Sequence, residues 1–183
     1  DVKELLYAGC RAVALNMAKQ SNIELISEAG ARFGKEKLYA CADAEEQILS
    51  HIDALKEYVS GIVLLNHEIP VDYADLRVII CSKRVDERAA LEILKQNCVH
   101  GISGPVINDH AGAFMELKSS FRQQGIPVNT FECSLKWSDL KASADGLIPV
   151  VVQDYRSDEV LMVAYMDETA FGTTIRTGKM TYY

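Results

Sequence analysis

Short apolar runs alternate with segments of helical periodicity over the first two thirds of the chain. The apolar runs are Ala12–Leu15, Leu38–Ala42, Ile62–Leu65, Val78–Cys81 and Val99–Ile102. Most of them are followed by a stretch in which apolar side chains recur every three or four positions, as on one face of a helix. A strand that leads into a crossover helix pairs in parallel with the next strand. The pattern therefore predicts an α/β fold built on a parallel sheet.

The helices are marked by end signals as well as by periodicity. The best-specified one begins at Ser21-Asn-Ile-Glu24, which has the spacing of a capping box, and ends at Gly34. Further helices are expected over Ala44–Val59, Asp86–Gln96 and Asn108–Gln124. Between Asn66 and Arg77, Pro70 and a short acidic stretch leave no room for a crossover helix. One helix of the repeat is therefore expected to be missing or degenerate.

The segment from Asp145 to Tyr183 has a different pattern. Two apolar runs flank Arg156-Ser157-Asp158, which predicts a β-hairpin that is buried on at least one face. A helix-like stretch follows, and Thr177–Tyr183 has the character of a third strand. We therefore expect a first domain over residues 1–128, a junction over 129–144, and the start of a small α+β domain, mainly antiparallel β, over 145–183.

Charge and cysteine usage limit the classes of partner. The net charge is −7 and the isoelectric point is near 5.1, which argues against a nucleic-acid or anionic-membrane surface because such surfaces need clustered Lys and Arg. The five cysteines are widely spaced and include no Cys-x-x-Cys, so the chain offers no local thiolate metal site. No apolar run approaches the ~20 residues that a membrane span needs. These features predict a cytoplasmic protein with reduced cysteines and a small polar partner.

The chain from about Trp137 onward resembles the opening of phosphoribosyl-AMP cyclohydrolase. The resemblance is carried by Asp145-Gly-Leu-Ile-Pro-Val-Val-Val-Gln-Asp-Tyr155 and Val160-Leu-Met-Val-Ala-Tyr-Met166. It implies a hydrolase of histidine biosynthesis that opens the adenine ring of phosphoribosyl-AMP, a small phosphoribosyl nucleotide. A homodimer is a candidate assembly.

The same resemblance implies two metal ions. A zinc ion would be held by cysteines and a magnesium ion by aspartates, all later in that family's domain than the position of Tyr183. No metal ligand is therefore assigned within this chain, and its substrate-binding residues are unknown. The 183-residue chain alone is expected to be a truncated and inactive part of the enzyme.

Residues 1–128 resemble a different histidine-biosynthesis protein, the cyclase subunit of imidazole glycerol phosphate synthase. The likeness is carried by Asp1–Asn16, Ala31-Arg-Phe-Gly34, the run Leu38–Asp43, and Leu117-Lys118 through Gly125-Ile-Pro-Val128. That family folds as a TIM-type barrel of eight strands, whereas the sequence shows about five strand signals. The resemblance thus implies a partial, degenerate βα-barrel segment.

Asp43 is the candidate catalytic residue. It follows the run Leu38–Ala42, and barrel enzymes place catalytic groups at the carboxyl ends of their strands. The matching aspartate of the resembled cyclase is an acid/base residue. Asp43-Ala-Glu-Glu46 also has capping-box spacing, so the favoured interpretation is that Asp43 caps the next helix.

The expected phosphate-binding turns depart from the barrel family's glycine-rich pattern. The turn after Val78–Cys81 is Ser82-Lys83-Arg84, and the turn after Val99–Ile102 is Ser103-Gly104-Pro105, in which proline has no amide to offer. The barrel part is therefore expected to be noncatalytic. Two alternatives stay open: it retains cyclase-type activity through Asp43, or it serves as an oligomerisation or interaction platform.

The four histidines give weaker candidates. None has the spacing of a paired metal site on one helix, and His51 and His100 are expected to face solvent or flank a strand. His67-Glu68 and Asp109-His110 both follow predicted strand ends. A surface-loop role is the favoured interpretation for both pairs.

Overall fold

A computed structural model describes residues 1–19 and 21–183 of the chain. The chain divides into two compact units, Asp1–His110 and Ala111–Tyr183. The predicted domain bounds of 1–128, 129–144 and 145–183 remain predictions.

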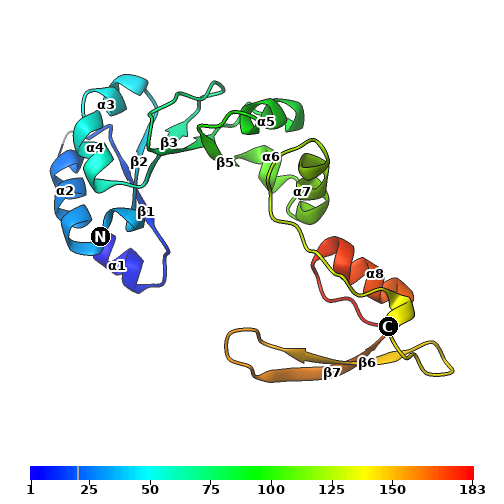
Figure 1. Cartoon of the computed structure of the whole chain (residues 1–183). Helices are drawn as coiled ribbons and strands as arrows, with labels where there is room; N and C mark the ends of the chain where they lie inside the picture. Colours follow the sequence, from blue (N-terminus) through cyan, green and yellow to red (C-terminus); the bar gives the residue numbers. More distant parts are fainter. Residues whose placement is uncertain (20) are drawn as a thin grey trace. The chain divides into compact units, whose positions relative to one another are not determined.

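The first unit is built on a five-stranded parallel sheet within the described residues. Its strands are β1 (Val13–Asn16), β2 (Leu38–Ala42), β3 (Gly61–Leu65), β4 (Arg77–Cys81) and β5 (Val99–Ser103). They lie in the order β1-β2-β3-β4-β5, so every strand pairs with its neighbours in the sequence (Figure 1). The predicted parallel α/β fold is confirmed, but the sheet is open and the expected barrel is not confirmed.

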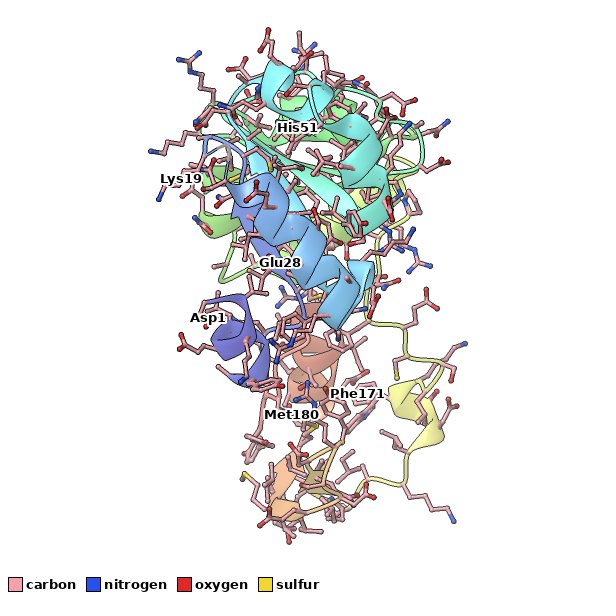
Figure 2. All side chains as sticks on the ribbon, turned by 90° about the vertical axis from the view of Figure 1, so that its left-hand side faces the viewer. Asp1, Lys19, Glu28, His51, Phe171 and Met180 are labelled. Carbon is pink, nitrogen blue, oxygen red and sulfur yellow. The ribbon has the colours of Figure 1, made fainter. Side chains whose placement is uncertain are left out.

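Helices connect most of these strands. In the first unit they are α1 (Val2–Tyr7), α2 (Asn22–Phe33), η1 (Lys35–Lys37), α3 (Glu45–Leu49), α4 (Ile52–Tyr58), α5 (Glu87–Leu94) and α6 (Pro105–Asn108). Between β3 and β4 the described chain has neither helix nor strand, as the sequence predicts. Glu28 is exposed and lies on the face of α2 that is turned away from the sheet (Figure 2).

Two of the helix predictions need correction. The capping box at Ser21 is not formed, because Ser21 itself has helical dihedral angles and its side chain makes no cap hydrogen bond. The helix expected over Ala44–Val59 is two helices, α3 and α4. The His51 amide donates to the carbonyl of Ile48, three residues back, and this tighter turn ends α3.

The helices bury only one face of the sheet. On that face Leu38, Ala40, Ile62, Leu64 and the neighbouring strand residues are fully buried. On the opposite face the alternate positions, which include Tyr39, Cys41, Val63, Leu65, Ile79 and Cys81, remain partly exposed. Figure 1 shows α2 and α4 on the same side of β1 and β2. Parallel sheets are normally covered on both faces, so this one is half covered in the described chain.

The second unit contains α7 (Phe114–Gln123), η2 (Trp137–Asp139), β6 (Ile148–Gln153), β7 (Val160–Met166) and α8 (Glu168–Thr177). The helix predicted over Asn108–Gln124 therefore begins later than expected, at Phe114.

The second unit has a small core, which comprises Leu117, Phe121, Ile126, Met166 and Ala170. Trp137 packs its ring against that of Phe171 on α8, with centroids 5.8 Å apart, so the junction docks onto this helix.

Strands β6 and β7 form the predicted antiparallel hairpin, from the pair Ile148 and Met166 to the pair Gln153 and Val160. Its turn is held by Asp154, whose Oδ1 accepts the backbone amides of Arg156 and Ser157, both at 2.9 Å. These hydrogen bonds lower the pKa of the Asp154 carboxyl group below its ordinary value.

The expected burial of this hairpin holds only in part. Val151 and Val163, which pair on one face, are 61% and 63% exposed, whereas on the other face Ile148, Val150 and Ala164 are half-buried and Met166 is buried. A two-stranded sheet has too few neighbours to cover its own apolar side chains. The predicted third strand is not formed in the described residues. Thr177 ends α8, and beyond it the Tyr183 amide alone reaches β7, where it donates to the Tyr165 carbonyl at 2.9 Å.

Within the described part of the chain, no helix is both long and apolar enough to cross a bilayer.

Candidate functional site

The carboxyl edge of the sheet brings Asp43 together with two residues that follow the next strand. Asn66 Nδ2 donates to Asp43 Oδ1 at 3.0 Å, and His67 Nε2 donates to the Asp43 carbonyl oxygen at 2.8 Å. The contact arises because the ends of neighbouring parallel strands β2 and β3 meet at one edge. Asp43 and His67 were both sequence candidates, whereas Asn66 was missed. Its position directly after an apolar strand is the signal that points to it.

The favoured interpretation of Asp43 as a helix cap is wrong. The helix α3 begins at Glu45 with Ala44 as its N-cap residue, and no side chain makes the cap hydrogen bond. The carboxylate of Asp43 is instead held by Asn66. An aspartate that follows a strand and serves no helix end is free for another role, and its catalytic role stays a proposal.

Cys41 lies two residues before Asp43, on the uncovered face of the sheet. Burial raises the pKa of the Cys41 thiol, and the nearby Asp43 and Cys81 raise it further. A raised pKa keeps the sulfur protonated, and a protonated thiol is a poor nucleophile and metal ligand. Cys41 therefore gives this edge no reactive thiolate.

Of the two turns that match the phosphate-binding turns of barrels, the one after β4 uses two of its amides internally. The Ser82 amide donates to the Ser103 carbonyl at 3.2 Å, and the Arg84 amide donates to Ser82 Oγ at 3.2 Å. The Arg84 guanidinium pairs with Glu68 at 3.8 Å, and both side chains are exposed. Amides that are already bonded cannot cradle a phosphate.

The other three histidines lie on other elements, His51 at the start of α4, His100 in β5 and His110 after α6. His110 Nδ1 donates to the Val106 carbonyl at 2.9 Å, and its Nε2 lies 3.8 Å from Glu87. His51 is the N-cap residue of α4, and His100 Nδ1 bonds the Cys98 carbonyl at 3.0 Å. Across residues 1–19 and 21–183 no three His, Cys, Asp or Glu side chains gather as a metal site would require. The described residues do not fit the zinc and magnesium ions that the resemblance implies.

Tyr73 is a buried polar group without a partner. It lies in the segment between β3 and β4, is 4% exposed, and its hydroxyl makes no hydrogen bond in the structure. Desolvation raises the pKa of Tyr73 to about 12, and the nearby carboxylates of Glu45 and Glu46 add to the effect. The hydroxyl is thus a cost to folding that the surrounding residues do not offset.

We expect Tyr73→Phe to raise the free energy of unfolding by about 1 kcal/mol, because the variant removes a desolvated hydroxyl and keeps the ring. The pH dependence of the free energy of unfolding should change as well. Unfolded tyrosine loses its proton near 10.0, whereas folded Tyr73 keeps it to about 12. The folded state therefore holds more protons in this window, and stability falls as the pH rises through it.

Urea unfolding at pH 8 and at pH 11 measures both effects, with Tyr7→Phe as control because Tyr7 is 72% exposed. The stability that the parent protein loses between the two pH values should shrink in Tyr73→Phe alone. A loss of stability in Tyr73→Phe at pH 8 would show that the hydroxyl has a partner in solution.

Comparison with known proteins connects part of the chain to one enzyme family. Phosphoribosyl-AMP cyclohydrolase of Streptomyces avermitilis is 50% identical over 44 residues, which are 24% of this chain and 33% of that protein. Part of the chain is therefore similar to phosphoribosyl-AMP cyclohydrolases. The cyclohydrolase of Rhodospirillum rubrum is 42% identical over 52 residues, which are 28% of this chain and 36% of that protein.

The similarity extends to a two-function protein. Histidine biosynthesis bifunctional protein HisIE of Aquifex aeolicus is 52% identical over 44 residues, which are 24% of this chain and 22% of that protein. The chain spans about a third or less of the length of these relatives. No protein-family model matches the chain. The predicted cyclohydrolase resemblance is confirmed over a short segment, and the barrel resemblance is not shown.

Proposed function

We propose that this chain is part of a phosphoribosyl-AMP cyclohydrolase, which opens the adenine ring of phosphoribosyl-AMP by hydrolysis in histidine biosynthesis. The observation that carries the proposal is the match of about 50% identity over 44 residues to proteins with that name. The hairpin β6–β7 and the helix α8 belong to the segment on which the sequence resemblance rests. They form one consecutive strand-turn-strand-helix unit, with Met166 and Ala170 buried where the unit packs.

In this proposal the chain supplies scaffold and not the metal centre. The described residues contain no group of three donors, so we assign the zinc and magnesium ligands of the complete enzyme to residues outside this chain. The enzyme is proposed to be cytoplasmic, to take a small phosphoribosyl nucleotide, and to associate as a homodimer.

We expect the 183-residue chain alone to show no ring opening of phosphoribosyl-AMP, even with zinc and magnesium added, because it lacks a fitting donor set. The measurement is the change in absorbance that accompanies loss of the intact adenine ring. Turnover above that of the buffer with the same metals would contradict both the assignment of the ligands and the expected inactivity.

A second test is a chimera, for which the proposed function predicts activity. Residues 137–183 replace the aligned stretch of the Streptomyces avermitilis enzyme, and the chimera is expected to turn over within about tenfold of the parent, a difference of ~1.4 kcal/mol in activation free energy. The matched control is the same chimera with Met166→Asp, which buries an unpaired carboxylate at a 4% exposed position and should abolish folding. A folded but inactive first chimera would count against the proposal.

For residues 1–128 we propose a noncatalytic segment of a βα barrel. Two features of the first unit support it: the strands follow in sequence order, and the helices cover a single face of the sheet. Both are properties of a barrel wall, whereas doubly wound sheets reverse their order and carry helices on both faces. The loss of phosphate binding is supported by the turn after β4, in which the amides of Ser82 and Arg84 already make internal hydrogen bonds.

A cyclase-type activity is the second candidate, and the placement of Asp43 at the carboxyl edge favours it. If the barrel part is noncatalytic, Asp43→Asn should change the free energy of unfolding by less than about 1 kcal/mol, since the carboxylate is exposed and asparagine keeps an acceptor for Asn66. Asp53→Asn on α4 is the control for removal of one exposed charge.

Both variants are measured for stability and, in the longest available form of the protein, for cyclase turnover. Parent turnover that Asp43→Asn abolishes and Asp53→Asn preserves would establish the second candidate. The third candidate, an interaction platform, predicts that deleting residues 1–128 leaves cyclohydrolase turnover intact and changes the assembly.

A further inference from the structure

A basic cavity lies at the amino edge of the sheet in the first unit, at the opposite ends of the strands from Asp43. Its volume is about 860 Å³. Five cationic residues line it: Arg11, Lys35, Lys37, Lys56 and Arg77. They come from four places in the sequence, namely the residues before β1, the η1 turn before β2, the helix α4, and the start of β4. The parallel topology brings these segments together because it places all strand beginnings at one edge.

The charge of this cavity differs in sign from that of the chain. Two acidic residues, Glu36 and Asp75, line it beside the five cations, whereas the whole chain has 19 Lys and Arg against 26 Asp and Glu. None of the ion pairs in the described part of the chain includes any of the five. Like charges around a concave surface focus a positive potential into it. An anion in the cavity would relieve the mutual repulsion of these side chains.

The floor of the cavity is shaped by a close approach across three strands. Tyr39, Gly61 and Arg77 occupy the same register on β2, β3 and β4. A Cβ atom on Gly61 would lie 2.8 Å from Cε1 of Tyr39 and 2.5 Å from the Arg77 carbonyl oxygen. The absence of that atom lets the Tyr39 ring lie over β3 beside Arg77, so the cavity has an aromatic surface next to its cations.

We propose that this cavity binds a small polyanion that carries two or more phosphoryl groups. The cations exceed what a single phosphate can neutralise, and arginine and lysine are the side chains that pair with phosphoryl oxygens. The volume is within the range of ~300–1,000 Å³ that small-ligand sites have, and a nucleic-acid strand needs an extended basic groove instead. The proposal is independent of the cyclohydrolase similarity, which concerns another part of the chain.

The test is calorimetric titration of the full 183-residue chain with inorganic pyrophosphate at low and at moderate salt. Binding with a dissociation constant below about 1 mM at low salt, and weakening as salt is added, is expected. The pocket variant is Lys37→Gln with Arg77→Gln, which should weaken binding at least about tenfold. Its matched control is Lys83→Gln with Arg88→Gln, which removes one exposed lysine and one exposed arginine elsewhere in the same unit.

The possible results distinguish binding in this cavity from a general attraction of the anion to basic side chains. Equal weakening in both double variants, or no binding by the parent chain, would overturn the proposal. Where the pocket variant melts early by circular dichroism, Lys56→Gln replaces it, because Lys56 is exposed on α4 and its loss spares the sheet. Parallel titrations with ATP and with inorganic triphosphate identify the source: tighter binding of ATP than of triphosphate assigns a nucleotide that uses Tyr39, and equal binding assigns a free polyphosphate.

Discussion

Gly104→Ala should lower the free energy of unfolding of the first unit by about 3 kcal/mol, from backbone strain and a steric clash together. Gly104 has φ of 135° and ψ of −168°, a region that residues with a Cβ atom avoid. The added Cβ would lie 2.2 Å from the Ser82 carbonyl oxygen, which is backbone and has little room to move. The clash therefore separates the ends of β4 and β5.

Gly101→Ala is the control for this substitution, three residues earlier in β5. Its Cβ would meet Ile79 at 3.6 Å, an ordinary contact distance, and no unusual φ is needed there. We expect it to change stability by no more than about 0.5 kcal/mol, as for most substitutions without a named mechanism. Urea unfolding followed by circular dichroism compares the two variants. A Gly104→Ala protein as stable as Gly101→Ala would show that the Ser82 backbone lies farther away in solution.

Leu64→Ala should cost 2–5 kcal/mol, a range typical of cavities left by truncated core leucines. Leu64 has no exposed surface and lies on the sheet face that the helices cover. Its neighbour Leu65 points to the other face and is partly exposed. We expect Leu65→Ala to cost less than about 1 kcal/mol, since less apolar surface returns to water.

This pair of leucines measures how completely the second face is uncovered. Both variants remove the same atoms from adjacent positions of β3, so the difference between them reports the environment of each face. Equal losses of stability would mean that the second face is covered in solution. A rise in stability with protein concentration in the parent would then identify a second copy as the cover.

The strands of the first unit were predictable because each is a short apolar run with its own boundary signals. Leu38–Ala42 was predicted with its exact bounds, three other strands differ by one residue at one end, and β1 differs by one residue at both ends. Helix ends were predicted less well. Ser21 has the right spacing for a capping box, yet its own dihedral angles continue the helix, and a pattern of residue types carries no information on that choice.

The candidate site was also predictable only in part. The position of Asp43 at the end of an apolar run identified it, because the carboxyl edges of parallel strands follow from local pattern alone. Its partner Asn66 is 23 residues away, and only the pairing of β2 with β3 brings the two together. The basic cavity was missed for the same reason, since its five cations are scattered in the sequence and meet at the amino edge.

The order of strands and helices and the similarity to cyclohydrolases can be found in the sequence alone, because periodicity and motif are properties of neighbouring residues. Burial depends on contacts with residues that are distant in the sequence. The hairpin β6–β7 has apolar residues on both faces, of which one is exposed and the other only partly buried, and the parallel sheet has apolar residues on both faces but helices on one. Which apolar face finds a cover, and which charges meet in a cavity, was decided by tertiary structure, since the contacts join residues that the sequence keeps far apart.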